Sequence, residues 1–224
     1  GIAILRYCDI TCQSVSVTES HLPVIEMRPY RWGVDDVELP DAAGPALAGL
    51  GVKRATPAVD PDQAVAPESA LPAEVTAALV DAVGANHVSS EAAVRVRHTR
   101  GWSTPDLLKL RSGDASDAPH AVVFPGSHEQ VLAVLEICSE HRVAVVPFAG
   151  GTSVVGGLTP EREGFGAVVA LDSRRLDSVD DLDEISRTVR LGTGLRGTRA
   201  EALLNEAGYT LGHFPQSYEG ASIG

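Results

Sequence analysis

A glycine-rich loop at residues 147–160 is the segment whose composition is best suited to chemistry. It reads PFAGGTSVVGGLTP, with two Gly-Gly pairs around the hydroxyl residues Thr152 and Ser153, and it follows an apolar stretch. Glycine lets the backbone turn tightly and approach a ligand, so several N–H groups and two hydroxyls can bind one anion without a basic side chain. The loop therefore predicts an anion site. The alternative is a loop whose glycines only permit a turn.

The acidic character of the chain does not exclude such a site. Eighteen basic and thirty acidic side chains give a net charge of -12. Salt screens distant charges beyond about 8 Å, whereas each hydrogen bond to a charged oxygen contributes about 1.5 to 3 kcal/mol. The loop has the G-x4-G spacing of a phosphate loop but lacks the Lys and Ser/Thr that follow it in nucleotide triphosphatases, which disfavours ATP hydrolysis.

A second glycine motif, GTGLRG at 192–197, matches the G-x-G-x-x-G pattern of dinucleotide-binding turns. The first strand of such a fold is buried on both faces, whereas the preceding SRTVRLG is polar at every second position. We therefore expect Gly192 and Gly194 to serve a tight bend. A Rossmann protein that binds a nicotinamide cofactor is the alternative.

Three other groups of residues have both a chemical and a structural interpretation. His213 could be a base, but a histidine of a turn is the commoner case. Cys138 lies on the apolar stripe of a predicted helix and is expected in the core. The acidic group indicates a solvated turn rather than a metal site, and it comprises Asp177, Asp180, Asp181, Asp183 and Glu184.

Strands and helices alternate along the second half of the chain, which predicts an α+β or α/β class. The expected strands are 121–124, 143–148, 167–171 and 186–191. Between the first two strands we predict a helix that begins with a capping box of Ser127 and Gln130. A later helix has the same spacing at Thr198 and Glu201, and Gly208 is expected to end it.

The first half is less regular. We expect an N-terminal extension over 1–97, a linker over 98–117 and a folded domain over 118–224. Within the extension, 73–84 has helical spacing and ends at Gly84. Residues 1–26 are expected to be a tag or a misassigned start, because Met27 is the only methionine.

Composition excludes several classes of partner. The net charge of -12 without a basic patch argues against nucleic acid. No apolar run approaches the roughly 20 residues of a membrane helix, and no secretory leader is recognised, so a cytoplasmic location is expected. Cys8, Cys12 and Cys138 form no zinc or disulfide pattern and are expected to be reduced thiols. No metal is predicted.

Several segments together resemble a known family. PFAGGTSVVGG, preceded by DAPHAVVFPGSHEQVLAVLEICSEHRVAVV and followed by GHFPQSYEGASIG, is similar to the FAD-binding domain of the p-cresol methylhydroxylase (PCMH) and vanillyl-alcohol oxidase superfamily. HTRGWSTPDLL and GHFPQSYE most resemble its alkyldihydroxyacetonephosphate synthase-like group. The D-lactate and glycolate dehydrogenases usually carry Arg after the loop proline and Gly-Leu-Ser after its threonine, and this sequence differs at both places. The resemblance implies an α+β, two-subdomain FAD-binding PCMH-type fold, here incomplete at the C-terminus and preceded by an extension.

The resemblance also implies a cofactor and the residues that hold it. FAD is expected to be non-covalent, because Thr152 and Ser153 occupy the stretch where several members attach it through a His. Gly220 stands where this group tends to carry an aromatic residue. The loop that wraps the pyrophosphate is expected to comprise Pro147, Phe148, Ala149, Gly150, Gly151, Thr152, Ser153 and Val154. The segment along the flavin is expected to comprise Gln216, Ser217, Tyr218, Glu219, Gly220, Ala221, Ser222, Ile223 and Gly224.

The function implied is that of a flavin-dependent oxidoreductase or transferase with a small-molecule substrate that is lipid-like or hydroxylated. The reaction would be exchange of an acyl group for a fatty alcohol on a glycerone phosphate ester. The alternatives are a D-lactate or glycolate type dehydrogenase and a non-catalytic fragment. The family's catalytic residues follow the FAD domain, so they are expected beyond Gly224 and none is named here. This chain alone is expected to be inactive, and the protein is expected to be a homodimer.

Overall fold

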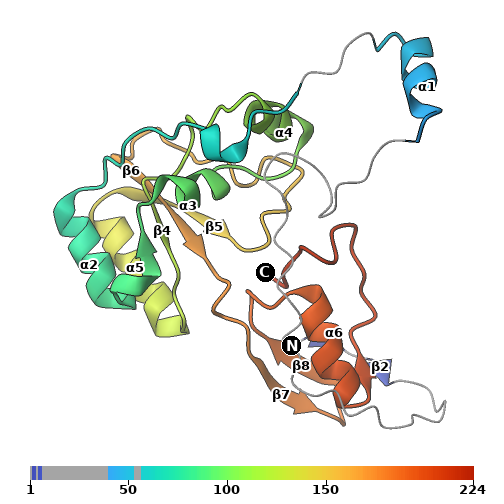
Figure 1. The fold of residues 1–224 in the computed structure, drawn as a ribbon. Helices are drawn as coiled ribbons and strands as arrows, with labels where there is room; N and C mark the ends of the chain where they lie inside the picture. The colour runs from blue at the N-terminus through green and yellow to red at the C-terminus, as the bar shows by residue number, and fades with distance from the viewer. Residues whose placement is uncertain (1, 4, 7–39, 53–56) are drawn as a thin grey trace.

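The computed structural model describes residues 2–3, 5–6, 40–52 and 57–224. Two subdomains lie beside each other (Figure 1). The first subdomain is built on a four-stranded sheet between residues 57 and 172. The second is built from residues 179–224, which supply one helix and two strands of a three-stranded sheet, and from residues 2–3, which supply the third strand. The described parts confirm the expected α+β class.

The first sheet has the strand order β3-β4-β6-β5, in which β4, β6 and β5 are parallel and β3 is antiparallel. All six residues of the central strand β6 are buried, which explains its unbroken apolar sequence. Helix α5 connects β4 to β5, and residues 149–166 connect β5 to β6 without a helix. The strands are β3 (Val88–Ser89), β4 (Ala121–Val123), β5 (Val143–Phe148) and β6 (Ala167–Asp172).

Helices α2 (Ala73–Val83) and α5 (His128–Glu140) pack on each other against this sheet (Figure 1). The predicted start of α5 is confirmed, since the Ser127 hydroxyl accepts a hydrogen bond from the Gln130 N–H at 3.2 Å. In a full capping box the Gln130 side chain would accept from the N–H of Ser127. Here Gln130 Oε1 accepts from the N–H of Gly126, one residue earlier, at 2.7 Å. Helix α2 ends at Gly84, whose φ of 91° only glycine adopts readily.

The segment expected to be a linker is packed into the first subdomain. It contains α4 (Thr104–Arg111), and the side chains of His98, Thr99 and Trp102 are buried. Just before it, Arg95 in α3 (Ala92–Arg97) donates to the carbonyl of Pro119 at 2.6 Å. The packing is therefore continuous across residue 118, and the structure differs here from the expected boundary. Sequence patterning missed this because polar side chains fix the segment by hydrogen bonds.

The second subdomain pairs its strands antiparallel. A hairpin of β7 (Val179–Asp183) and β8 (Thr188–Leu191) is extended by β1 (Ile2–Ala3), and β2 (Leu5–Arg6) pairs with β9 (Tyr209–Thr210). Helix α6 (Gly197–Glu206) packs its buried side on this sheet through Leu204. The short elements that remain are α1 (Ala43–Gly49), η1 (Pro61–Gln63) and η2 (Ala85–His87).

The start of α6 and the acidic group differ from the sequence expectations. The N-cap of α6 is Arg196 and not Thr198. Glu201 is buried, and its carboxylate accepts hydrogen bonds from the Thr210 hydroxyl and the Gly212 N–H, each at 2.9 Å. The expected end at Gly208 is confirmed by its φ of 79°. The acidic group forms the exposed strand β7 and its hairpin rather than a turn alone, and within the described ranges no His, Cys, Asp and Glu side chains gather as a metal site.

Cys8, Cys12 and the remainder of 1–26 outside β1 and β2 lie beyond the described residues. In the described part of the chain, no helix combines the length and apolar character needed to cross a membrane.

Cys138 is confirmed as a core residue, and its burial makes a testable difference to its reactivity. Desolvation raises the pKa of its thiol to about 11. At pH 8 this leaves about 100-fold less thiolate than an exposed cysteine with a pKa near 9. We expect iodoacetamide to label the Cys138 peptide at least that much more slowly in native than in denatured protein, as measured by mass spectrometry. Equal rates would show that α5 does not pack as described.

Candidate functional site

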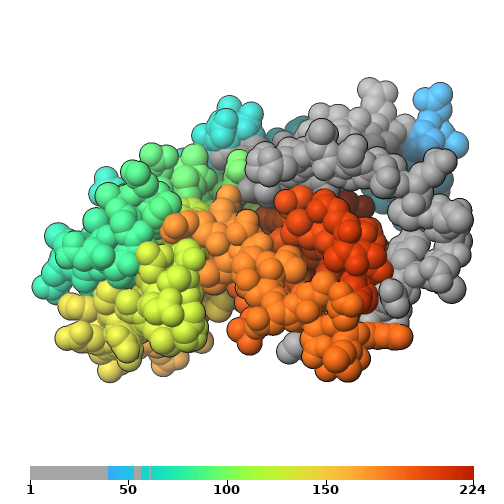
Figure 2. All heavy atoms as spheres, turned by 90° about the horizontal axis from the view of Figure 1, so that it is seen from below, coloured from blue at the N-terminus to red at the C-terminus, as the bar shows by residue number. Residues whose placement is uncertain are grey.

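A cavity of about 900 Å³ lies where the two subdomains meet. This volume is at the upper end of the range of about 300 to 1,000 Å³ typical of cofactor and ligand sites. Figure 2 shows the two subdomains from below, with the green-to-yellow first subdomain beside the orange-to-red second one. The first subdomain lines the cavity with residues 126–128, Val131, Leu135, Val145, residues 147–153, Leu158 and Leu171. The rest of the chain lines it with residues 173, 175–178, 191–193, 222 and 224.

Both predicted segments contribute to this cavity, but not with all their residues. Residues 147–153 line it, as do Ser222 and Gly224. Val154 is half-exposed, and it and residues 216–221 and 223 are outside the lining. Seven of the eight predicted loop residues therefore line the cavity, whereas only Ser222 and Gly224 of the second segment do.

The two segments are in direct contact with each other. A Cβ built on Gly150 would lie 2.3 Å from the carbonyl oxygen of Gly220, so only glycine fits between them. The Arg196 guanidinium donates to the same carbonyl at 2.5 Å. Further along, the N–H of Ile223 donates to the carbonyl of Leu195 and that of Gly224 donates to the carbonyl of Thr193, both at 2.9 Å. The backbone beyond β8 thus fixes the second segment beside the glycine loop.

The glycine loop leaves backbone donors available. Among the described residues, the N–H groups of Ala149, Gly150, Gly151 and Thr152 have no hydrogen-bond acceptor. Polar backbone groups that lie partly buried in a folded protein are rarely left without a partner. Gly151 has a φ of 69°, and such left-handed turns gather successive N–H groups into an anion-binding concavity. The geometry therefore fits the predicted anion.

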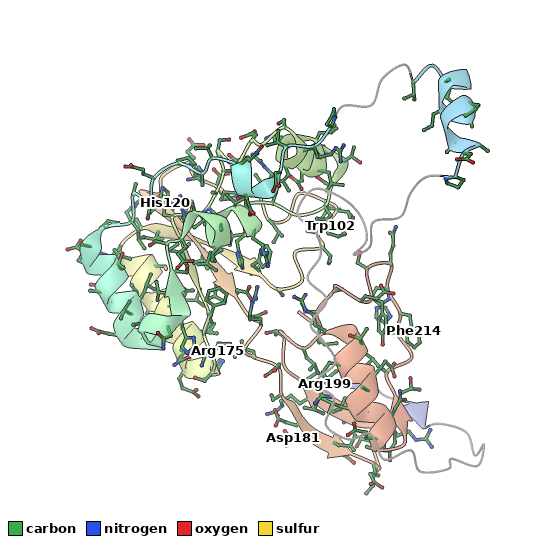
Figure 3. The ribbon with its side chains drawn as sticks, in the orientation of Figure 1. Trp102, His120, Arg175, Asp181, Arg199 and Phe214 are labelled. Atoms are coloured by element: carbon green, nitrogen blue, oxygen red, sulfur yellow. The ribbon has the colours of Figure 1, made fainter. Side chains whose placement is uncertain are left out.

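The opposite wall contains residues that sequence reasoning missed. Gly126, Ser127 and His128 at the start of α5 line the cavity together with Arg175, which follows β6. The Arg175 guanidinium donates to the carbonyl of Phe124 at 2.7 Å and lies between the two subdomains (Figure 3). Both segments follow the carboxyl ends of parallel strands, where ligands bind in open α/β sheets, and this signal could have identified them.

The GTGLRG motif packs closely against another part of the backbone. Cβ atoms on Gly192 and Gly194 would lie 2.2 Å and 1.9 Å from the carbonyl oxygens of Leu176 and Ser173. The preceding strand β8 is antiparallel to both of its neighbours, which rules out a Rossmann turn here. The N–H of Leu195 donates to the carbonyl of Gly192 at 3.2 Å, which confirms the expected tight bend. Gly192 and Thr193 also line the cavity, while His213 is exposed on the surface.

Beneath the glycine loop, Asp172 at the end of β6 is completely buried. Burial acts to raise its pKa, but hydrogen bonds and charges from His98 and Arg174 outweigh this and hold the pKa of the carboxyl below its usual value. The His98 Nε2 lies 2.8 Å and the Arg174 Nη2 lies 2.7 Å from the same carboxylate oxygen. Asp172 is therefore a buried carboxylate held by the His98 ring and the Arg174 guanidinium.

Comparison with known proteins agrees with this geometry. Residues 119–224 match the family described as FAD binding domain. The chain is similar to alkyldihydroxyacetonephosphate synthases from Caenorhabditis elegans, with 36% identity over 61% of this chain and 23% of the relative, and from Dictyostelium discoideum, with 34% identity over 58% and 21%. A solved alkyldihydroxyacetonephosphate synthase structure superposes with a TM-score of 0.71 and 28% identity, covering 75% of this chain and 31% of that one. The chain thus spans about a fifth of the length of these curated relatives.

Proposed function

We propose that the chain is the FAD-binding portion of a flavin-dependent enzyme of the alkyldihydroxyacetonephosphate synthase type, because residues 119–224 match the family described as FAD binding domain and the chain is similar to these synthases. FAD is the cofactor of this family. In this proposal the glycine loop 147–154 wraps the pyrophosphate and residues 216–224 run along the flavin.

The observation that carries the proposal is the set of four available N–H donors at residues 149–152 beside a cavity of about 900 Å³. A pyrophosphate needs several donors at close range, and backbone N–H groups supply them without the basic residues that this acidic chain lacks at the loop. Gly150 and Gly151 carry no side chain that would keep the phosphates away from these groups. The residues present therefore fit the cofactor.

The second segment supports the proposal through its position. Ser222 and Gly224 line the same cavity as the loop, and the Gly220 carbonyl contacts Gly150. We propose that FAD is bound without a covalent link, because the loop carries Thr152 and Ser153 and no histidine.

Bound FAD would supply the redox or carbanion-stabilising chemistry, and this chain would bind and orient it and exclude water from its phosphates. The substrate is a small molecule. We propose exchange of an acyl group for a fatty alcohol on a glycerone phosphate ester, because the synthases compared above are 36% and 34% identical to this chain and the solved synthase structure covers 75% of it. No catalytic residue is assigned within the chain.

The experiment that tests the cofactor uses the full-length natural protein. Its visible spectrum is recorded, the protein is denatured and filtered, and the filtrate is analysed for flavin. We expect a yellow protein that releases all of its flavin as free FAD. Flavin that stays with the polypeptide would overturn the non-covalent part, and a colourless protein that FAD cannot reconstitute would overturn the proposal in favour of a non-catalytic chain.

A second assay separates the proposed reaction from that of a D-lactate or glycolate type dehydrogenase. We expect the FAD-loaded protein to form an ether lipid from an acyl glycerone phosphate and a fatty alcohol, as detected by mass spectrometry. Anaerobic addition of D-lactate or glycolate should leave the flavin spectrum unchanged. Bleaching by either hydroxy acid without ether formation would favour the dehydrogenase.

A cytoplasmic location and a homodimer stay predictions. Cell fractionation and light scattering on the purified full-length protein test them.

A further inference from the structure

His98 is a buried histidine to which the proposed function gives no role. It follows α3, and only 1% of its side chain is exposed. Both ring nitrogens have partners, since Nδ1 lies 2.7 Å from the carbonyl oxygen of Val94 and Nε2 lies 2.8 Å from Asp172 Oδ2.

These two contacts fix the orientation of the ring. The Val94 carbonyl oxygen can only accept a hydrogen bond, so it bonds to the N–H at Nδ1. The Asp172 carboxylate, which also accepts hydrogen bonds from the Nε and the backbone N–H of Arg174, each at 2.8 Å, contacts Nε2. The His98 ring is therefore held at both nitrogens.

The ring of His98 supports the glycine loop from below. It packs on the ring of Phe148 with 4.3 Å between the centroids. Phe148 ends β5 and pairs in register with Asp172 at the end of β6, so the hydrogen-bonded pair and the aromatic ring lie at the same level of the sheet. On its other side, the Phe148 Cζ lies 2.8 Å from the position that a Cβ on Gly151 would take. His98 thus reaches the loop through a single side chain.

The residues that follow His98 hold the same loop by its backbone. The N–H of Trp102 donates to the carbonyl of Ser153 at 2.5 Å. A Cβ on Gly101 would lie 2.3 Å from that carbonyl oxygen, so the two backbones are in close contact. Residues 98–102 therefore contact both halves of the turn, Gly151 through Phe148 and Ser153 directly.

We infer that His98 is a positioning residue for the cofactor loop: clamped between Val94 and Asp172, its ring holds Phe148 against Gly151 and so fixes the turn that gathers the N–H donors of residues 149–152. The inference rests on the proposed function, because it concerns the same FAD site. His98 touches no cofactor itself and acts through Phe148. The alternative is a core histidine that stabilises the fold without affecting the loop.

The test compares FAD affinity with fold stability in the full-length protein. FAD is removed, and the dissociation constant of FAD is measured by titration for the wild type, His98→Gln and Val134→Ala. Val134 is fully buried between α5 and the sheet, outside the cavity lining, so its truncation destabilises the same subdomain without touching the loop. Residues that orient the ligands of a metal site from behind typically change metal affinity or activity about 10- to 100-fold when replaced, and this range sets the scale of the expected effect.

We expect His98→Gln to weaken FAD binding at least about tenfold, and Val134→Ala to leave it unchanged although its melting temperature falls. Equal dissociation constants for the wild type and His98→Gln would overturn the inference and leave the proposed function intact. A wild type that does not bind FAD would overturn the proposed function itself.

A double-mutant cycle adds a result that a purely structural role would not give. If His98 acts through Phe148, Phe148→Leu should weaken FAD binding and His98→Gln should add little in its presence. Independent, additive losses in the double variant would contradict the positioning role. Because Phe148→Leu keeps a large apolar side chain, the cycle remains informative even where one variant is less stable than the other.

Discussion

Replacing Gly150 with alanine is expected to abolish retention of FAD. The added Cβ would lie 2.3 Å from the Gly220 carbonyl oxygen, 2.8 Å from the Arg196 guanidinium and 3.0 Å from the Ala221 Cα. The backbone of Gly220 and Ala221 cannot move away freely, because hydrogen bonds to residues 195–197 hold this segment in place. The loop and the second segment must separate, and a displacement of about 1 Å at a binding site can reduce function about 100-fold.

The measurement is the FAD content of full-length protein after purification, together with the dissociation constant after reconstitution. Gly166→Ala is the matched control, because Gly166 ends the same β5–β6 connection and a Cβ there would meet nothing within 4 Å. The control should retain FAD like the wild type. If Gly150→Ala also retains it, the contact between the two segments is not required for binding.

Replacing Asp172 with asparagine is expected to lower the free energy of unfolding by about 3 to 5 kcal/mol, the usual loss when one partner of a buried ion pair is removed. The amide is nearly isosteric, so no cavity forms. It nevertheless leaves the His98 ring and the Arg174 guanidinium without the carboxylate that both contact. Urea unfolding of full-length protein at pH 7 measures the change, and Asp177→Asn, at an exposed position, should change it by less than about 0.5 kcal/mol.

The same carboxylate predicts the direction of a pH effect. The pKa of Asp172 is lowered in the folded protein, so its contribution is fully present above the unfolded value of about 3.9. As the pH falls below that value, the unfolded protein binds a proton at Asp172 while the folded protein keeps the carboxylate ionised. The stability that Asp172 contributes therefore decreases and is lost as the pH falls through the folded pKa. We expect the stability gap between wild type and Asp172→Asn to be constant from pH 7 to 5 and to shrink below pH 4. A gap that stays constant into strong acid would contradict an ionised Asp172.

Much of the first subdomain could be predicted because its signals are local. The apolar runs that became β4, β5 and β6, the Ser127 cap of α5 and the glycine loop each depend on a few consecutive residues. The prediction failed where burial is achieved by polar contacts. His98 and Trp102 lie in a segment rich in Gly, Ser and Pro, yet they are buried, because the His98 ring pairs with Asp172 and the Trp102 N–H donates to Ser153, both far along the chain.

For the site, the sequence by itself determined the chemistry, and the tertiary structure decided the geometry. A net charge of -12 and a loop without basic side chains already favoured backbone N–H groups and hydroxyls as the anion's partners, and the folded cavity adds Arg175. Only the folded chain brings Gly150 against Gly220 and His98 against Asp172, pairs separated by about 70 residues each. Such contacts depend on strand order and close backbone approach, which no local pattern encodes.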